Sequence, residues 1–160
     1  MLNITLLCVG KLKEKFYTDA VAEYAKRLPR YCKLEIVELP EERLPEAPSP
    51  AQIAAALEKE ASAIRSKLPS SALIIALCVE GKLRSSEDLA RMLADSAGRG
   101  QSQVVFLIGG SFGLDPSVKA LAAERLSMSP MTFPHHLARV MVLEQIYRAY
   151  QINAGTRYHK

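Results

Sequence analysis

The amino-acid sequence predicts an α/β fold with a parallel sheet, and three observations support that prediction. Apolar, β-branched runs alternate with helical patterns along the chain, as they do when helices connect parallel strands. Each run is continuously apolar rather than alternating, which is typical of strands that are buried on both faces. The chain has 160 residues, of which 49% are hydrophobic and 24% are charged. Because this length and these proportions are those of one ordinary globular domain, we expect residues 1–160 to form a single domain.

The elements of the first half of the chain follow from local patterns. The predicted strands of the whole chain are Asn3–Val9, Leu34–Leu39, Ala72–Cys78, Gln103–Ile108 and a short one near Leu126–Ser129. The first helix, Phe16 to Leu28, is indicated by apolar residues on one stripe with lysines and arginines opposite. Proline- and glutamate-rich residues 40–50 indicate a loop. The second helix begins at Ser49-Pro50, because serine is a good N-cap and proline is favoured in the first helical turn.

One helix is expected before the fourth strand and another after it. Ser85-x-x-Asp88 resembles an acidic capping signal, and the helix that it opens extends to about Ala97. Asp115-Pro116 has the same pattern of a capping side chain followed by proline, and it opens a short helix.

The last helix is predicted from near His135 to Asn153, with Gly155 as its stop signal. Residues Val140 to Leu143 are apolar around the whole circumference of this helix. Such a helix is buried on more than one side. In a chain of this length, that pattern suggests a subunit interface.

Composition excludes several classes of protein. The longest apolar stretch, Ala72 to Val79, is too short to span a bilayer, which takes about 20 residues. The first residues are apolar at once and lack the basic region of a signal peptide. Cys8, Cys32 and Cys78 are widely spaced and form no C-x-x-C, so we expect neither disulfides nor a zinc site. These features are typical of a cytosolic domain without a metal.

The net charge of +4 is mild, but it is unevenly distributed. Residues 11–33 hold seven basic and three acidic groups, whereas residues 34–60 hold two and seven. From Arg125 to Lys160 there are five basic groups against Glu144 alone. We therefore expect an anionic partner to dock on the C-terminal segment.

Three loops follow predicted strands, where open α/β sheets bind ligands. The first loop is 77–82, the second is 108–113 and the third is 126–134. The glycines of the second loop allow close approach of the backbone to a ligand, but their spacing fits neither a dinucleotide fingerprint nor a P-loop. A plain strand-to-helix turn explains this loop equally well.

The third loop and the C-terminal tail are less ordinary. Two prolines, two methionines and Phe133 make residues 126–134 a poor helix and a poor strand. Such a segment is suited to a flat heterocycle such as adenine, and a packed loop is the other interpretation. The tail Thr156–Lys160 combines an aromatic ring, an imidazole and cations, a mixture that single-stranded RNA recognition uses.

Taken in order, these motifs resemble the RlmH-type enzymes of the SPOUT superfamily, and the resemblance covers essentially the whole chain. The most specific matches are Met131-Thr132-Phe133-Pro134-His135 and Glu144-Gln145-x-Tyr147-Arg148-Ala149. Other matches are Leu6–Lys13, Glu23-Tyr24-x-x-Arg27, Gly81-Lys82 with Ser85–Glu87, Ile108-Gly109-Gly110-x-x-Gly113-Leu114 and Tyr158–Lys160.

The resemblance implies a SPOUT-type parallel sheet with a C-terminal trefoil knot, and S-adenosylmethionine as cofactor in a knot region of about residues 72–160. It also implies a homodimer that methylates N3 of a pseudouridine in large-subunit ribosomal RNA, on the ribosome. Its motifs assign the cofactor to Leu77, Gly109, Met128, Ser129, Pro130, Met131, Thr132 and Phe133. They assign catalytic or RNA-facing roles to His135, Arg139, Tyr158 and His159, the last two toward the partner subunit's site.

These assignments leave a mechanism and two rival functions open. His135 or His159 is the expected base or base-orienter, and Arg139 is expected to stabilise the developing ring anion. One rival is a nucleotide-binding α/β protein that uses the glycine loop for phosphate. The other is a module that binds ribosomal RNA without catalysis.

Overall fold

The computed structural model describes residues 1–160 and contains one sheet of five parallel strands, in the order β2-β1-β4-β3-β5. The strands are β1 (Asn3–Val9), β2 (Lys33–Leu39), β3 (Leu73–Leu83), β4 (Gln103–Ile108) and β5 (Glu124–Ser127). The predicted parallel α/β sheet is therefore confirmed, whereas the trefoil knot stays a prediction. The order places β4 between β1 and β3, so segments far apart in sequence meet at the carboxyl edge of the sheet.

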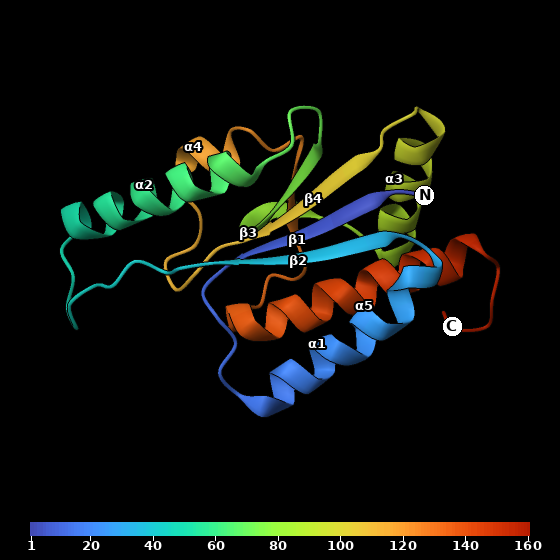
Figure 1. The fold of residues 1–160 in the computed structure, drawn as a ribbon, viewed down its shortest axis with the longest axis horizontal. Coiled ribbons are helices and arrows are strands. Elements are labelled where there is room, and N and C mark those ends of the chain that lie inside the picture. Colours follow the sequence, from blue (N-terminus) through green and yellow to red (C-terminus); the bar gives the residue numbers. More distant parts are fainter.

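Helices cover both faces of this sheet (Figure 1). They are α1 (Lys15–Arg27), the 3-10 turn η1 (Leu28–Arg30), α2 (Pro50–Lys67), α3 (Ser86–Gly98), α4 (Pro116–Lys119) and α5 (His135–Asn153). Helices α2 and α4 lie on one face, and α1, α3 and α5 lie on the other, with α5 in contact with both α1 and α3 (Figure 1). The predicted bounds of α5 are confirmed at both ends.

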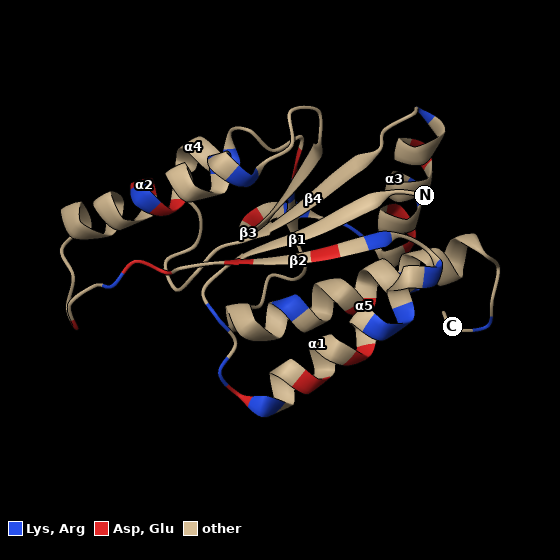
Figure 2. Ribbon diagram, viewed as in Figure 1, with Lys and Arg blue, Asp and Glu red and all other residues tan.

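The core lies in two layers because successive side chains of a strand point to opposite faces. Leu6 and Cys8 of β1 belong to the layer beneath α3 and α5, and Leu7 and Val9 belong to the layer beneath α2 and α4. The predicted burial on both faces is thus confirmed for β1 and β4, whereas Lys33 and Glu35 are exposed because β2 lies at the edge of the sheet. The acidic run that follows β2 leaves this core and leads to α2 (Figure 2).

Two predicted helix starts are capping boxes. Oγ of Ser49 accepts from the backbone N–H of Gln52 at 3.1 Å. In return, the backbone N–H of Ser49 donates to the side-chain oxygen of Gln52. Ser85 and Asp88 repeat this exchange at the start of α3, at 3.0 Å in each direction. Each box satisfies amide groups that the first turn of a helix leaves without partners.

Strand β3 differs from its prediction, because it continues to Leu83 through the segment 77–82 that the sequence indicated as a loop. Leu77 and Lys82 both pair with Leu126 of β5, so the residues between them form a bulge in the ladder. A Cβ atom at Gly81 would lie 2.7 Å from the carbonyl oxygen of Arg125. Glycine is thus required here by the close approach of β5. In the sequence, the same glycine was interpreted as the signal of a turn.

Helices α1 and α5 are incompletely covered. No residue of α1 is buried, although Tyr17, Val21 and Tyr24 lie on one half-buried stripe. On α5, Val142 is buried and Met141 is only half-buried. No helix of the structure combines the length and the hydropathy that a membrane span requires.

We predict that Gly81→Ala lowers the free energy of unfolding by about 1–3 kcal/mol, because the added methyl group is forced against the backbone of β5. Gly98→Ala is the matched control, since a Cβ atom there meets nothing within 4 Å. This control should be neutral or stabilising by up to about 1 kcal/mol. Urea denaturation of both variants measures the difference, and equal stabilities would contradict the close approach.

Candidate functional site

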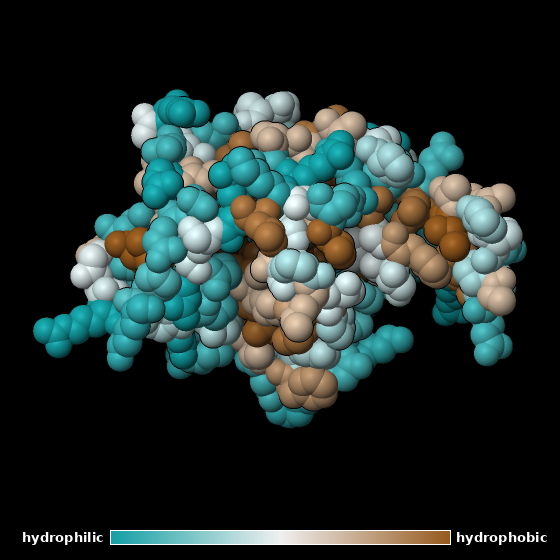
Figure 3. All heavy atoms as spheres, turned by 180° about the vertical axis from the view of Figure 1, so that it is seen from behind, coloured by the Kyte–Doolittle hydropathy of each residue, from teal (hydrophilic) through white to brown (hydrophobic).

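A pocket opens at the carboxyl ends of β3, β4 and β5, beside the first turn of α5. Of its 15 lining residues, 9 are hydrophobic, so the pocket suits a ligand with a large apolar or aromatic part. The lining comprises Leu77, Cys78, Val79, Ile108, Gly109, Gly110, Gly113, Leu126, Ser127, Met128, Ser129, Met131, Phe133, His135 and Ala138. Seen from behind, apolar side chains reach the surface near the middle of the molecule (Figure 3).

The glycine loop after β4 forms one wall of this pocket through its backbone. The N–H of Gly113 donates to the carbonyl of Gly110 at 3.1 Å, and Gly113 has a φ of 80°, in the left-handed region. A Cβ atom at Gly109 would lie 2.4 Å from the backbone of Gly113. The loop is therefore closed on itself so tightly that only glycine fits at position 109.

Glu41 holds the outer side of the same loop. Its Oε1 accepts from the backbone N–H of Ser111 at 2.8 Å and would lie 2.5 Å from a Cβ atom at Gly110. Sequence reasoning missed this residue because it lies in the loop 40–50, 70 residues before its contact. The only available signal was an acidic residue two positions after the end of β2.

The loop 126–134 forms the opposite wall. Oγ of Ser127 donates to the carbonyl of Ser129, and Oγ of Ser129 accepts from the N–H of Met131, each at 3.0 Å. These local bonds replace strand pairing, which the prolines at 130 and 134 prevent. Met131 itself is 73% exposed.

The structure brings most of the predicted cofactor residues together. Those that line the pocket are Leu77, Gly109, Met128, Ser129, Met131 and Phe133. Pro130 and Thr132 lie in the same loop, but they are exposed and do not line the pocket. Two residues that the family motifs did not assign to the cofactor also line it: Ser127, which lies in the indicated loop 126–134, and Ala138 of α5.

His135 is the first residue of α5 and the predicted catalytic residue that lines the pocket. Its Nε2 is buried and has no hydrogen-bond partner. Burial, followed by the charges of His136 and Arg139, holds the pKa of His135 below its ordinary value, against an opposing effect of Glu41. The imidazole is therefore neutral near pH 7, with a ring nitrogen left for a ligand.

Arg139 lies one helical turn further, beneath the pocket rather than in its lining. Its side chain is 1% exposed, and Nη1 donates to Oε2 of Glu38 at 2.6 Å. Nη2 donates to the carbonyl oxygens of Gly10 at 2.7 Å and Val9 at 3.4 Å. The guanidinium thus joins α5 to the carboxyl ends of β1 and β2.

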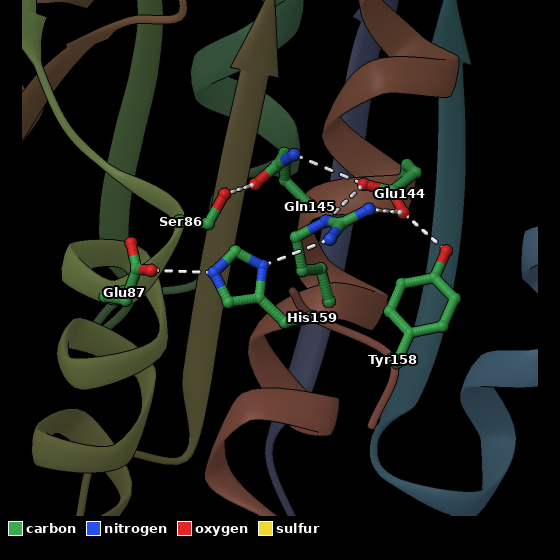
Figure 4. Close-up of polar contacts among 7 residues, drawn as sticks. Ser86, Glu87, Glu144, Gln145, Tyr158 and His159 are labelled. Carbon is green, nitrogen blue, oxygen red and sulfur yellow. Dashed lines mark hydrogen bonds and ion pairs between the residues drawn. The ribbon is translucent and has the colours of Figure 1, made fainter. Parts of the chain in front are cut away.

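Tyr158 and His159 lie in a separate cluster at the other end of α5 (Figure 4). The hydroxyl of Tyr158 donates to Oε2 of Glu144 at 2.6 Å, and Glu144 also pairs with Arg148. Burial and this carboxylate raise the pKa of Tyr158 to about 12. Burial by itself would raise the pKa of Glu144, but its hydrogen bonds from Arg148 and Tyr158 outweigh that effect and lower it. These interactions hold the tail against its own subunit.

The predicted catalytic residues therefore occupy three places. His135 lines the pocket, Arg139 is buried beneath it, and the tail cluster lies against Glu144 and Arg148. A helix rises 1.5 Å per residue, so about 20 Å separate His135 from Arg148 along α5. Within one chain, the tail residues and the pocket do not meet.

The fold and the pocket define a class: a parallel α/β protein with a largely apolar pocket at the carboxyl ends of its strands, where such sheets bind ligands. Comparison with known proteins identifies the family within this class. A family model described as "Predicted SPOUT methyltransferase" matches residues 2–159. The chain belongs to this family.

Curated relatives match the chain over nearly its whole length. The "Ribosomal RNA large subunit methyltransferase H" of Clostridium novyi is 50% identical over 159 residues, covering 99% of this chain and 100% of the relative. The proteins of the same name from Bifidobacterium adolescentis and Ligilactobacillus salivarius are 51% and 47% identical, with the same coverage. The resemblance seen in the sequence is thus confirmed.

We predict that Glu38→Ala destabilises the protein more than Arg139→Met does. Removing Glu38 leaves a guanidinium that is 1% exposed without its counter-charge, which costs about 3 kcal/mol or more. Removing Arg139 leaves a carboxylate whose side chain is 33% exposed and can be hydrated, while methionine fills the volume. Denaturant unfolding of both variants measures the order, and the reverse order would show that Arg139 is not held by this carboxylate.

We also predict a pH effect from His135. Because its pKa is lower in the folded than in the unfolded chain, the unfolded chain binds the proton first, and stability falls as the pH drops through about 6.5. In His135→Gln this loss between pH 7 and pH 5 should be smaller. Thermal unfolding of both proteins over that range tests it, and parallel curves would exclude a neutral, buried imidazole.

Proposed function

We propose that this chain is an S-adenosylmethionine-dependent methyltransferase that methylates N3 of a pseudouridine in large-subunit ribosomal RNA. The relatives at about 50% identity are named as methyltransferases of that RNA. The observation that carries the proposal is the pocket, since six of the eight residues that the family motifs assign to the cofactor line it. We further propose that the chain works as a single domain and a homodimer, in the cytoplasm, on the assembled ribosome.

The pocket has features that fit S-adenosylmethionine. Leu77, Met128 and Phe133 provide apolar surface for an adenine ring, and the glycine loop presents backbone at Gly109. The buried Nε2 of His135 has no partner within the chain and is available to a polar group of the ligand. When bound, S-adenosylmethionine supplies an electrophilic methyl group on a sulfonium.

The chain's own residues orient the reaction and exclude water. The two loops and α5 hold the reactants in line, and positioning of this kind contributes several kcal/mol. Neutral His135 lines the pocket, where it can orient a bound ring. Arg139 positions this histidine from beneath, because it ties the first turns of α5 to Glu38 and to the end of β1.

A homodimer would explain the faces that the fold leaves open. Helix α1 buries none of its residues, and Tyr147 and Tyr150 of α5 stay half-buried although they pack against Tyr31. A second copy of the chain packed there would cover both helices. Because Tyr158 and His159 contact Glu144 and Arg148, which lie about 14 and 20 Å along α5 from His135, we propose that they act at the partner subunit's pocket.

The decisive experiment is transfer of labelled methyl to ribosomes from a strain that lacks the modification, with free ribosomal RNA as the comparison. Incorporation at N3 of the pseudouridine on ribosomes supports the proposal. Binding that weakens with salt but transfers no methyl would instead indicate a non-catalytic RNA-binding module. Calorimetry with NAD or ATP in place of S-adenosylmethionine tests a nucleotide-binding protein.

We predict that Gly109→Ala weakens S-adenosylmethionine binding at least about 30-fold, or about 2 kcal/mol, since the methyl group displaces the backbone of Gly113 into the pocket. Gly98→Ala, whose Cβ atom meets nothing within 4 Å, is the control. Calorimetry measures the affinity, and circular dichroism confirms that both variants are folded. Unchanged affinity in Gly109→Ala would place the cofactor elsewhere.

A further inference from the structure

The contacts of His159 determine which of its ring nitrogens carries hydrogen (Figure 4). Nδ1 lies 3.1 Å from Nη1 of Arg148, and Nε2 lies 2.6 Å from Oε1 of Glu87. A guanidinium has donors only, so Arg148 donates to Nδ1, and Nδ1 carries no hydrogen. Nε2 therefore carries it and donates to Glu87. The ring is held with its lone pair on Nδ1.

Glu87 is well placed to stabilise a positive charge on this ring. It is the second residue of α3, and the hydrogen bond from His159 is the first cause of its lowered pKa. The carboxylate is therefore ionised near pH 7. A carboxylate on one ring nitrogen holds the imidazole in one tautomer and stabilises the imidazolium that forms when the other nitrogen accepts a proton.

Arg148 presents a donor beside that lone pair. Its Nε and Nη2 bind the two carboxylate oxygens of Glu144 at 3.0 and 3.1 Å, so its position does not depend on His159. The hydrogen bond between Nη1 and Nδ1 can therefore be exchanged for bonds to a ligand while this anchor is kept. Together, Nδ1 of His159 and Nη1 of Arg148 offer an acceptor and a donor side by side.

This pair complements one kind of nucleobase edge. In the imide of a uracil-type ring, an N–H donor stands between two carbonyl acceptors. Nδ1 can accept from the N–H while Nη1, 3.1 Å away, donates to a flanking carbonyl. A cytosine-type ring has no hydrogen on N3. Its N3 lone pair would face the lone pair on Nδ1, and the two would repel each other.

We propose that Glu87, His159 and Arg148 recognise and deprotonate the imide edge of the target base, with Glu87 as the positioning residue. The assignment rests on the proposed function. The N3–H bond breaks as Nδ1 takes the proton, the bond from N3 to the methyl carbon forms, and the carbon–sulfur bond breaks to leave a neutral thioether. The positive charge lost by the sulfonium thus ends on the His159 imidazolium, beside the Glu87 carboxylate.

The first test is spectroscopic and needs no activity. Long-range 15N correlation spectra of the wild-type protein should show His159 with hydrogen on Nε2 and none on Nδ1. Glu87→Gln should keep this tautomer, because the amide oxygen still accepts, whereas removal of both ring partners in Glu87→Ala/Arg148→Met should give a mixture. Hydrogen on Nδ1 in the wild type would overturn the proposal.

The second test is kinetic. Glu87→Gln should lower kcat for methyl transfer to unmodified ribosomes about 10- to 100-fold, with unchanged affinity for S-adenosylmethionine, because only the charge is removed. Asp95→Asn is the control: it removes an exposed carboxylate from the same helix, and we expect wild-type rates. Equal rates in Glu87→Gln and the control overturn the role of Glu87 alone. Absence of transfer by the wild type would overturn the proposed function, and this role with it.

Discussion

The buried guanidinium of Arg139 is the interaction on which the arrangement of the carboxyl edge depends. It is the largest fully buried side chain of the protein, and its contacts join α5 to Glu38 of β2 and to the backbone that leaves β1. Because burial of an unpaired charge is costly, the guanidinium must stay at these acceptors. Their position therefore fixes the position of α5. The first turn of α5, and with it His135, is thereby held at the pocket. One ion pair within the fold thus governs the geometry of a site that it does not line.

The pocket then follows from close backbone approaches rather than from long side chains. Gly109 and Gly81 each lie where another strand or turn leaves no room for a Cβ atom. The first closes the loop after β4, and the second lets β5 pass close to the bulge of β3. A pocket built in this way has walls that are set by the backbone of the sheet and its loops.

Local patterns were sufficient for much of this fold. The bounds of β1, β4 and α5 and both capping boxes follow from periodicity and from side chains within four residues. The extension of β3 was missed because Glu80-Gly81-Lys82 resembles a turn until Leu126 of β5 is placed beside it. The positions of Arg139 and His159 depend on contacts 101 and 72 residues away, which no local pattern contains. The family motifs named these residues but not their contacts.

Helix α5 also sets the distance between the pocket and the cluster around Tyr158 and His159. Its first turn belongs to the pocket, and its last turns carry Glu144 and Arg148 toward the tail. Each residue of an α-helix advances the chain by about 100° of rotation. A single insertion or deletion within the helix would therefore turn Arg148 away from α3 and change the spacing of the two centres at once. We expect the length of α5 to be invariant during divergence, while the loop between β2 and α2 is free to change in length.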